Sequence, residues 1–116
     1  MTTTETITET QQKWLDSLME LHEFFSDNPE MIDGVVLNAA SWAHGSTEKQ
    51  RGEVARLAAR LGNCTVHDSG SSSMYARVVS DAFAPHAITL YAEKVAVGHK
   101  VQDAIPEKWE WDALQS

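Results

Sequence analysis

The chain has 116 residues, a formal net charge of −8, 42% hydrophobic residues and 22% charged residues. This length fits one domain, and the apolar content excludes an intrinsically disordered chain, which needs far fewer apolar residues. No apolar run approaches the roughly 20 residues that cross a bilayer. We therefore expect one domain over residues 1–116, without a membrane segment or a membrane partner.

The cysteine content and the N-terminal composition predict a cytoplasmic location. Cys64 is the one cysteine, so the chain cannot form an internal disulfide, which favours a reducing compartment. Residues 1–8 are polar and Thr-rich and lack the basic and apolar regions of a secretory signal. We expect these eight residues to be disordered.

A first helix is predicted over residues 9–27. Thr8 and Gln11 have the spacing of a capping box at its start. Asn28 precedes Pro29, and the residue before a proline disfavours helical geometry, so the helix should end there. Apolar side chains recur at steps of three and four along one face: Trp14, Leu15, Leu18, Leu21 and Phe25.

A buried strand is predicted over residues 35–40, which are apolar and β-branched at the start and follow the Asp33-Gly34 turn signal. A second helix is predicted over residues 47–61. Ser46 and Thr47 are both possible N-caps, and Thr47 has capping-box spacing to Gln50. The helix is long enough for a parallel crossover from strand 35–40 to the next strand, and an antiparallel placement is equally open.

Three further strands are predicted over residues 64–67, 74–80 and 87–93, with the Ser-rich residues 68–73 as a hairpin loop. Their short connections require antiparallel pairing. The predicted fold class is therefore α+β. We expect two helices packed on one face of a four-stranded, mainly antiparallel sheet, followed by a Trp-containing tail or edge segment over residues 102–116.

No residue pattern predicts catalysis, a cofactor or a metal. Cys64 and His67 are three residues apart and would point to opposite faces of a strand, and structural zinc needs four ligands. A catalytic cysteine needs a base beside it, and nothing in the sequence places a histidine there. We therefore expect a protein that is not an enzyme.

The charge distribution disfavours nucleic acid as a partner. Residues 1–33 contain eight acidic residues and one basic residue, whereas binding to DNA phosphates requires clustered positive charge. The alternative of a nucleic-acid-directed regulator depends on the outer face of the second helix, which carries Lys49, Arg51, Arg56 and Arg60.

Trp109 and Trp111 are the candidate protein-binding residues. Alternating residues of a strand share a face, and large aromatic side chains dominate interfaces when they are not in the core. Two roles are open for them. They cover the chain's own sheet, or they bind a second copy or another protein, because a sheet with helices on one side has a second side to cover.

Three segments carry a resemblance to a known group of proteins: 54–62 (VARLAARLG), 83–92 (FAPHAITLYA) and 109–114 (WEWDAL). Together they resemble short uncharacterised proteins of actinomycete genomes and actinobacteriophages, over about residues 10–114. Proteins of that group often have a cysteine after the last strong strand, where residues 93–101 have none. The resemblance implies an actinomycete or phage origin and no particular activity.

These observations favour a non-enzymatic interaction protein, encoded by a phage, that binds a bacterial protein of unknown identity in the host cytoplasm. A small homodimeric structural protein is the first alternative. A nucleic-acid-directed regulator is the second.

Overall fold

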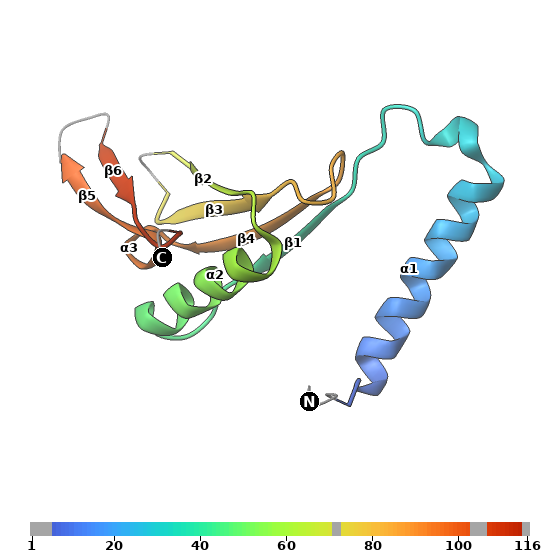
Figure 1. Cartoon of the computed structure of the whole chain (residues 1–116), viewed down its shortest axis with the longest axis horizontal. Coiled ribbons are helices and arrows are strands. Elements are labelled where there is room, and N and C mark those ends of the chain that lie inside the picture. The colour runs from blue at the N-terminus through green and yellow to red at the C-terminus, as the bar shows by residue number, and fades with distance from the viewer. Residues whose placement is uncertain (1–5, 71–72, 103–106, 115–116) are drawn as a thin grey trace. The chain divides into compact units, whose positions relative to one another are not determined.

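The computed structural model describes residues 6–70, 73–102 and 107–114 (Figure 1). The predictions for residues 1–5 and for part of the 102–116 tail lie outside these residues. The chain divides into two compact units, Met1–Val35 and Val36–Ser116. Each unit is described by itself.

The first unit contains helix α1 (Glu9–Asp27) and the 3₁₀ turn η1 (Pro29–Met31). The predicted capping box is confirmed. The Gln11 N–H donates to the Thr8 hydroxyl at 3.1 Å, and the Thr8 N–H donates to the Gln11 side chain at 3.0 Å. The helix ends before Pro29, as predicted.

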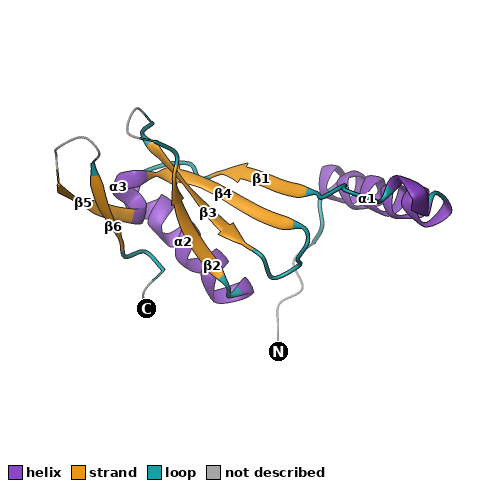
Figure 2. Cartoon of the chain, turned by 90° about the horizontal axis from the view of Figure 1, so that it is seen from above, coloured by secondary structure: helices purple, strands orange, loops and turns teal. Residues whose placement is uncertain are grey.

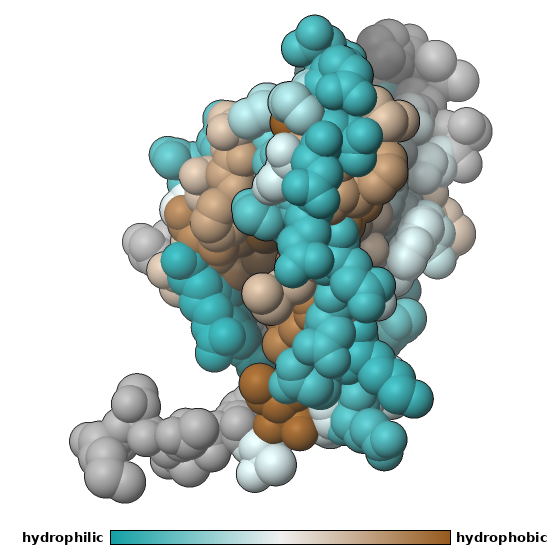
Figure 3. Space-filling view, turned by 90° about the vertical axis from the view of Figure 1, so that its right-hand side faces the viewer, coloured by the Kyte–Doolittle hydropathy of each residue, from teal (hydrophilic) through white to brown (hydrophobic). Residues whose placement is uncertain are grey.

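Helix α1 is amphipathic, and none of its residues is buried. Figure 3 shows hydrophilic and hydrophobic residues together at the surface of the face that it views. Within the described residues, no helix is long and apolar enough to cross a membrane.

The second unit is built on a four-stranded sheet with the order β1-β4-β3-β2, which Figure 2 shows side by side. Its strands are β1 (Asn38–Trp42), β2 (Cys64–Asp68), β3 (Tyr75–Ser80) and β4 (Ala87–Glu93). The pairs β2–β3 and β3–β4 are antiparallel, and β1 is parallel to β4. The predicted α+β class and the four-stranded, mainly antiparallel sheet are confirmed, and the parallel pair makes the sheet mixed.

The prediction of a buried strand over residues 35–40 is wrong in both position and burial. The strand spans 38–42, and all five of its residues are exposed. Leu37 fixes its start, because the Leu37 N–H donates to His86 Nδ1 at 3.0 Å and the Leu37 carbonyl accepts from the Ala87 N–H at 3.0 Å. β1 is an edge strand of the sheet, and the apolar run that suggested burial, residues 35–37, precedes it and is exposed.

Helix α2 (Thr47–Leu61) begins at Ser46, whose hydroxyl accepts from the Lys49 N–H at 3.2 Å. The capping box between Thr47 and Gln50 does not form, because the Gln50 side chain turns into the fold and is 3% exposed. Helix α2 lies along one face of the sheet (Figure 1), with Val54 buried in the core. The other predicted helix, α1, belongs to the first unit.

Buried residues alternate with less buried ones along β3. Ala76 and Val78 of β3 and Leu90 and Ala92 of β4 are buried on the face that packs against α2. Their strand neighbours point to the opposite face.

The chain ends with α3 (Lys94–Val97), β5 (Gly98–Gln102) and β6 (Lys108–Trp111). Strands β5 and β6 form a separate antiparallel pair, so the predicted edge segment is a strand of a two-stranded ribbon. Gly98 permits this pairing, because a Cβ atom there would lie 2.9 Å from Trp111 Cα and overlap the Glu110 carbonyl.

Candidate interaction surface

The sheet face opposite α2 carries a group of large side chains that we call the aromatic face: Trp42, Tyr75, Arg77 and Tyr91. Trp42 of β1 pairs in register with Tyr91 of β4, and Tyr91 pairs with Arg77 of β3. Tyr75 lies two residues before Arg77 on the same strand, and therefore on the same face. Three adjacent strands thus contribute to one continuous patch.

The three aromatic rings of this patch are in contact. The indole of Trp42 stacks on the Tyr91 ring, with centroids 4.6 Å apart and an interplanar angle of 18°. Trp42 also meets the Tyr75 ring edge-on, with centroids 4.9 Å apart and an angle of 90°. Contacts of this kind add about 0.5–1.5 kcal/mol beyond the burial of area, so the rings form an ordered surface.

This ordered surface is accessible. Trp42 is 50% exposed and Tyr75 is 38% exposed, and Tyr91 beneath them is half-buried. The described helices of this unit, α2 and α3, bury the other face, as the buried residues of β3 and β4 show. A sheet with one helix-covered face ordinarily has a second face that is solvated or bound by a partner.

Arg77 adds a cation to the aromatic face. Its side chain is exposed, and it makes no hydrogen bond or ion pair with the described residues. An arginine guanidinium presents a planar set of donors that fits a carboxylate through two parallel hydrogen bonds. Arg77 is therefore available to a carboxylate from outside the chain.

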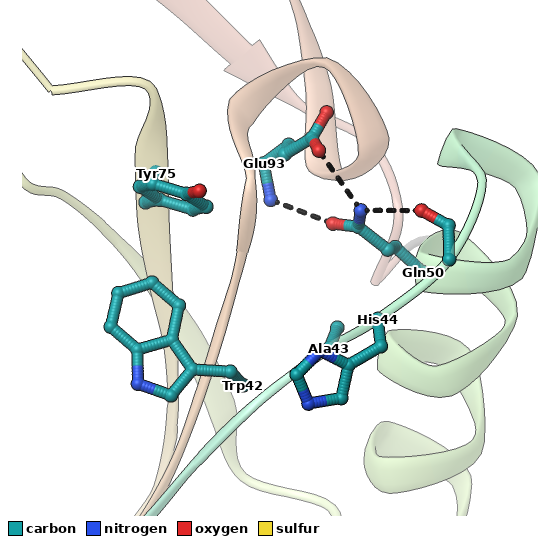
Figure 4. A pocket seen from close by; sticks show the side chains of 7 residues that line it. Trp42, Ala43, His44, Gln50, Tyr75 and Glu93 are labelled. Atoms are coloured by element: carbon teal, nitrogen blue, oxygen red, sulfur yellow. Dashed lines mark hydrogen bonds between the residues drawn. The ribbon is translucent and has the colours of Figure 1, made fainter.

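A pocket of about 280 Å³ adjoins the aromatic face at the carboxyl ends of the parallel strands β1 and β4 (Figure 4). Trp42 and Tyr75 form one side of it, and His44, Gln50 and Glu93 line the remainder. In open sheets with parallel strands, ligands bind beyond these carboxyl ends.

Hydrogen bonds fix the polar side of this pocket. Gln50 Nε2 donates to the Gly45 carbonyl at 3.0 Å and to Glu93 Oε1 at 3.1 Å, and the Glu93 N–H donates to Gln50 Oε1 at 2.9 Å (Figure 4). Gln50 thereby uses its buried amide fully. Glu93 Oε2 makes no hydrogen bond to the described residues.

Cys64 and His67 lie on opposite faces of β2, because they are three residues apart in a regular strand. The Cys64 thiol donates to the Gly62 carbonyl at 3.4 Å, and burial raises its pKa, which lowers the thiolate fraction. Among the described residues, no group of three or more acidic, histidine or cysteine side chains is placed to hold a metal ion.

The predicted basic face of α2 is partly used within the fold. Arg51 forms an ion pair with Asp112 at 2.6 Å and donates to the Ala96 carbonyl at 3.4 Å. Arg56 and Arg60 are exposed and make no ion pair with the described residues. With Lys49, three of the four predicted cations remain directed to solvent.

Trp109 and Trp111 share one face of β6, as predicted. Their rings stack with centroids 5.5 Å apart and an interplanar angle of 6°. Both residues are half-buried, and Trp111 packs against the hydrophobic core. The Nζ atoms of Lys94 and Lys100 lie 5.6 Å and 5.7 Å from the centroid of the Trp109 ring. The geometry thus gives Trp111 a packing role, and partner binding by the two tryptophans stays a prediction.

The aromatic face is not evident from the amino-acid sequence alone. Tyr75 and Arg77 alternate within the predicted strand 74–80, but Trp42 lies beyond the end of the predicted strand 35–40. The missing information was the pairing of β1 with β4, which places Trp42 beside Tyr91. Aromatic residues at the ends of several predicted strands were the available signal.

No protein-family model, no curated protein sequence and no solved structure matches this chain.

Proposed function

We propose that this protein is a non-enzymatic interaction protein, encoded by an actinobacteriophage, that binds a protein of its bacterial host in the host cytoplasm. The origin rests on the resemblance carried by segments 54–62, 83–92 and 109–114. The binding role rests on the aromatic face, which joins side chains of three adjacent strands on an accessible face of the sheet.

The residue types of the aromatic face favour a protein partner. Tryptophan, tyrosine and arginine are the residues most enriched among those that dominate the binding energy of protein interfaces. Trp42, Tyr75 and Tyr91 are held by one another, so little side-chain entropy is lost when a partner covers them.

Charge complementarity indicates what the partner presents. Arg77 lies directly across from Tyr91 and makes no ion pair with the described residues. A partner segment with apolar side chains and one carboxylate would cover the rings and pair with Arg77. We assign this chemistry to the bacterial partner.

The aromatic face favours a homodimer less than it favours a different partner protein. A twofold dimer brings identical surfaces together, so two copies of Arg77 would enter one interface. Like charges in a desolvated interface oppose association. Light scattering tests this alternative, because a dimer formed by this face has twice the 12.8 kDa mass of the chain.

The nucleic-acid alternative has little positive charge available. Arg51 is paired with Asp112, and the remaining cations of α2 are Lys49, Arg56 and Arg60. Binding of a nucleic-acid backbone depends on several phosphate contacts and weakens steeply with salt. This alternative would be supported if the protein retains nucleic acid at low salt, loses it at high salt, and no longer retains it after nuclease treatment.

The test is affinity capture from an actinomycete lysate with three forms of the full chain. These forms are the wild type, the double variant Trp42→Ala/Tyr75→Ala, and the control Phe83→Ala. Phe83 is 57% exposed in the turn between β3 and β4, so its removal deletes a comparable exposed aromatic outside the aromatic face. We expect one host protein to be retained by the wild type and the control and lost by the double variant.

A charge swap then tests the contact itself. Arg77→Glu should weaken binding of the purified partner by at least about tenfold, and an acidic-to-arginine change in the partner should restore it. Equal binding by the wild type and the Trp42→Ala/Tyr75→Ala variant, with folding verified by circular dichroism, would contradict the proposed surface.

A further inference from the structure

The pocket beside the aromatic face has features that the binding of an apolar segment does not explain. It lies beyond the carboxyl ends of β1 and β4, has a volume of about 280 Å³, and is lined by one acidic residue, Glu93. This volume is close to the lower end of pockets that hold small ligands. The pocket therefore fits one side chain or a molecule of similar size.

Two aromatic rings form one side of the pocket. Trp42 and Tyr75 both line it, and their planes are perpendicular with centroids 4.9 Å apart (Figure 4). Tyr91 stacks on the indole at 4.6 Å and holds it in place. Aromatic faces carry negative potential and attract cations, most strongly in the case of tryptophan.

Glu93 lines the pocket between Tyr75 and Gln50, and one oxygen of its carboxylate accepts from the Gln50 amide (Figure 4). Its orientation is fixed through Gln50, which is 3% exposed and whose amide bonds to both the side chain and the backbone of Glu93. The Oε2 atom makes no hydrogen bond to the described residues, so one carboxylate oxygen can accept a bond from a ligand.

We propose that this pocket binds an organic cation, namely the ammonium group of a lysine side chain of the partner protein. Aromatic rings and an anionic oxygen both attract a cation and both repel an anion. A neutral apolar group would gain nothing from Glu93. The identity of the cation rests on the proposed function, whereas the cation site itself is testable without any partner.

The first test uses small probes and the full wild-type chain. Choline and Nα-acetyl-lysine methylamide supply the cation, and 3,3-dimethylbutanol has the shape of choline without its charge. Titrations followed by ¹H–¹⁵N NMR should shift the Trp42 indole, the Gln50 side-chain amide and the Glu93 amide. We expect the neutral alcohol to bind at least about tenfold more weakly than choline. Equal affinities, or shifts confined to other residues, would overturn the proposal.

The second test removes only the charge. Glu93→Gln retains an oxygen that can accept from Gln50, so the pocket keeps its shape. Choline binding should weaken about tenfold in this variant, and the control Glu110→Gln, at an exposed position of β6, should bind as the wild type does. Wild-type affinity of the folded Glu93→Gln variant for choline would overturn the cation site.

The affinity of the partner protein tests the assignment to a lysine separately. Glu93→Gln should weaken the partner complex, and replacing one lysine of the partner by methionine should have the same effect without an additive loss in the double variant. If choline binds the pocket but Glu93→Gln leaves the partner affinity unchanged, the assignment to a partner lysine is wrong. If choline does not bind but partner binding depends on Trp42, the proposed function stands and this inference fails.

Discussion

Among single residues, Lys94 connects several segments of the second unit. It is 2% exposed, and its Nζ atom bonds to Asp68 at 2.7 Å and to the Gly70 carbonyl at 2.7 Å. The Gly70 N–H donates to the same Asp68 oxygen at 2.8 Å. A buried ammonium is tolerated because these acceptors replace its hydration.

Removing the Asp68 carboxylate should therefore destabilise the fold. We expect Asp68→Ala to lower the free energy of unfolding by about 1–3 kcal/mol, because Lys94 would lose its charged partner while staying buried. Asp68→Asn keeps an acceptor and should cost less than Asp68→Ala. Urea denaturation measures both variants. A wild-type unfolding free energy for Asp68→Ala would show that solvent replaces the carboxylate without cost.

Acid should weaken the fold through two carboxylates. Burial by itself raises the pKa of Asp68, but the hydrogen bonds from Lys94 and Gly70 outweigh it, and the net shift is downward. Hydrogen bonds from Arg51 and His99 lower the pKa of Asp112. A lowered folded-state pKa gives stability that is present above the unfolded-state pKa of roughly 3.9 and is lost as the pH falls through the folded-state pKa.

The corresponding measurement is the urea midpoint between pH 7 and pH 2. In the wild type, we expect the urea midpoint to decrease once the pH is lower than about 4. The fall should be smaller in the double variant Asp68→Asn/Asp112→Asn, which starts from a lower midpoint. An identical acid dependence in both proteins would contradict the role of these two groups.

At the scale of the elements, local chemistry made the helices predictable. The bounds 9–27 and 47–61 follow from caps and apolar periodicity, and both are confirmed. Strand β1 begins later in the chain than predicted. Its start is set by contacts of Leu37 with His86 and Ala87, which are 49 or more residues away in the chain. The aromatic face was missed for the same reason, because it exists only once β1 pairs with β4.

Two glycines give a matched test of element packing. Gly98→Ala should destabilise the protein by about 1–3 kcal/mol, because the new Cβ would overlap the Glu110 carbonyl in the β5–β6 pair. Gly52 lies inside α2 with no atom within 4 Å of its would-be Cβ, so Gly52→Ala should stabilise by about 0.5–1 kcal/mol. Thermal denaturation compares the two, and equal effects would contradict the packing of the ribbon.

The two terminal tryptophans should differ in their contribution to stability. Trp111 packs against the hydrophobic core, so Trp111→Ala should lower the free energy of unfolding by about 2–4 kcal/mol. Trp109→Ala should cost less, because Trp109 contacts the Trp111 ring, two lysines and, through a 3.5 Å hydrogen bond, Glu107, and is not among the residues packed against the core. Guanidinium denaturation of both variants checks this order, and the reverse order would contradict the packing role of Trp111.

At the scale of the whole molecule, the two units differ in charge. The unit Met1–Val35 contains eight acids and one base, and the unit Val36–Ser116 contains nine acids and eight bases. The aromatic face therefore belongs to a nearly neutral unit. Recognition there depends on individual groups such as Arg77 and Glu93 rather than on the net charge of the chain.

The most direct test of the aromatic face is an NMR footprint of the captured partner on the 116-residue chain. We predict that the resonances which shift or broaden belong to β1, β3 and β4, with the largest changes at Trp42, Tyr75, Arg77 and Tyr91. A footprint confined to β5 and β6, around Trp109 and Trp111, would contradict the assignment and return the binding role to the terminal tryptophans.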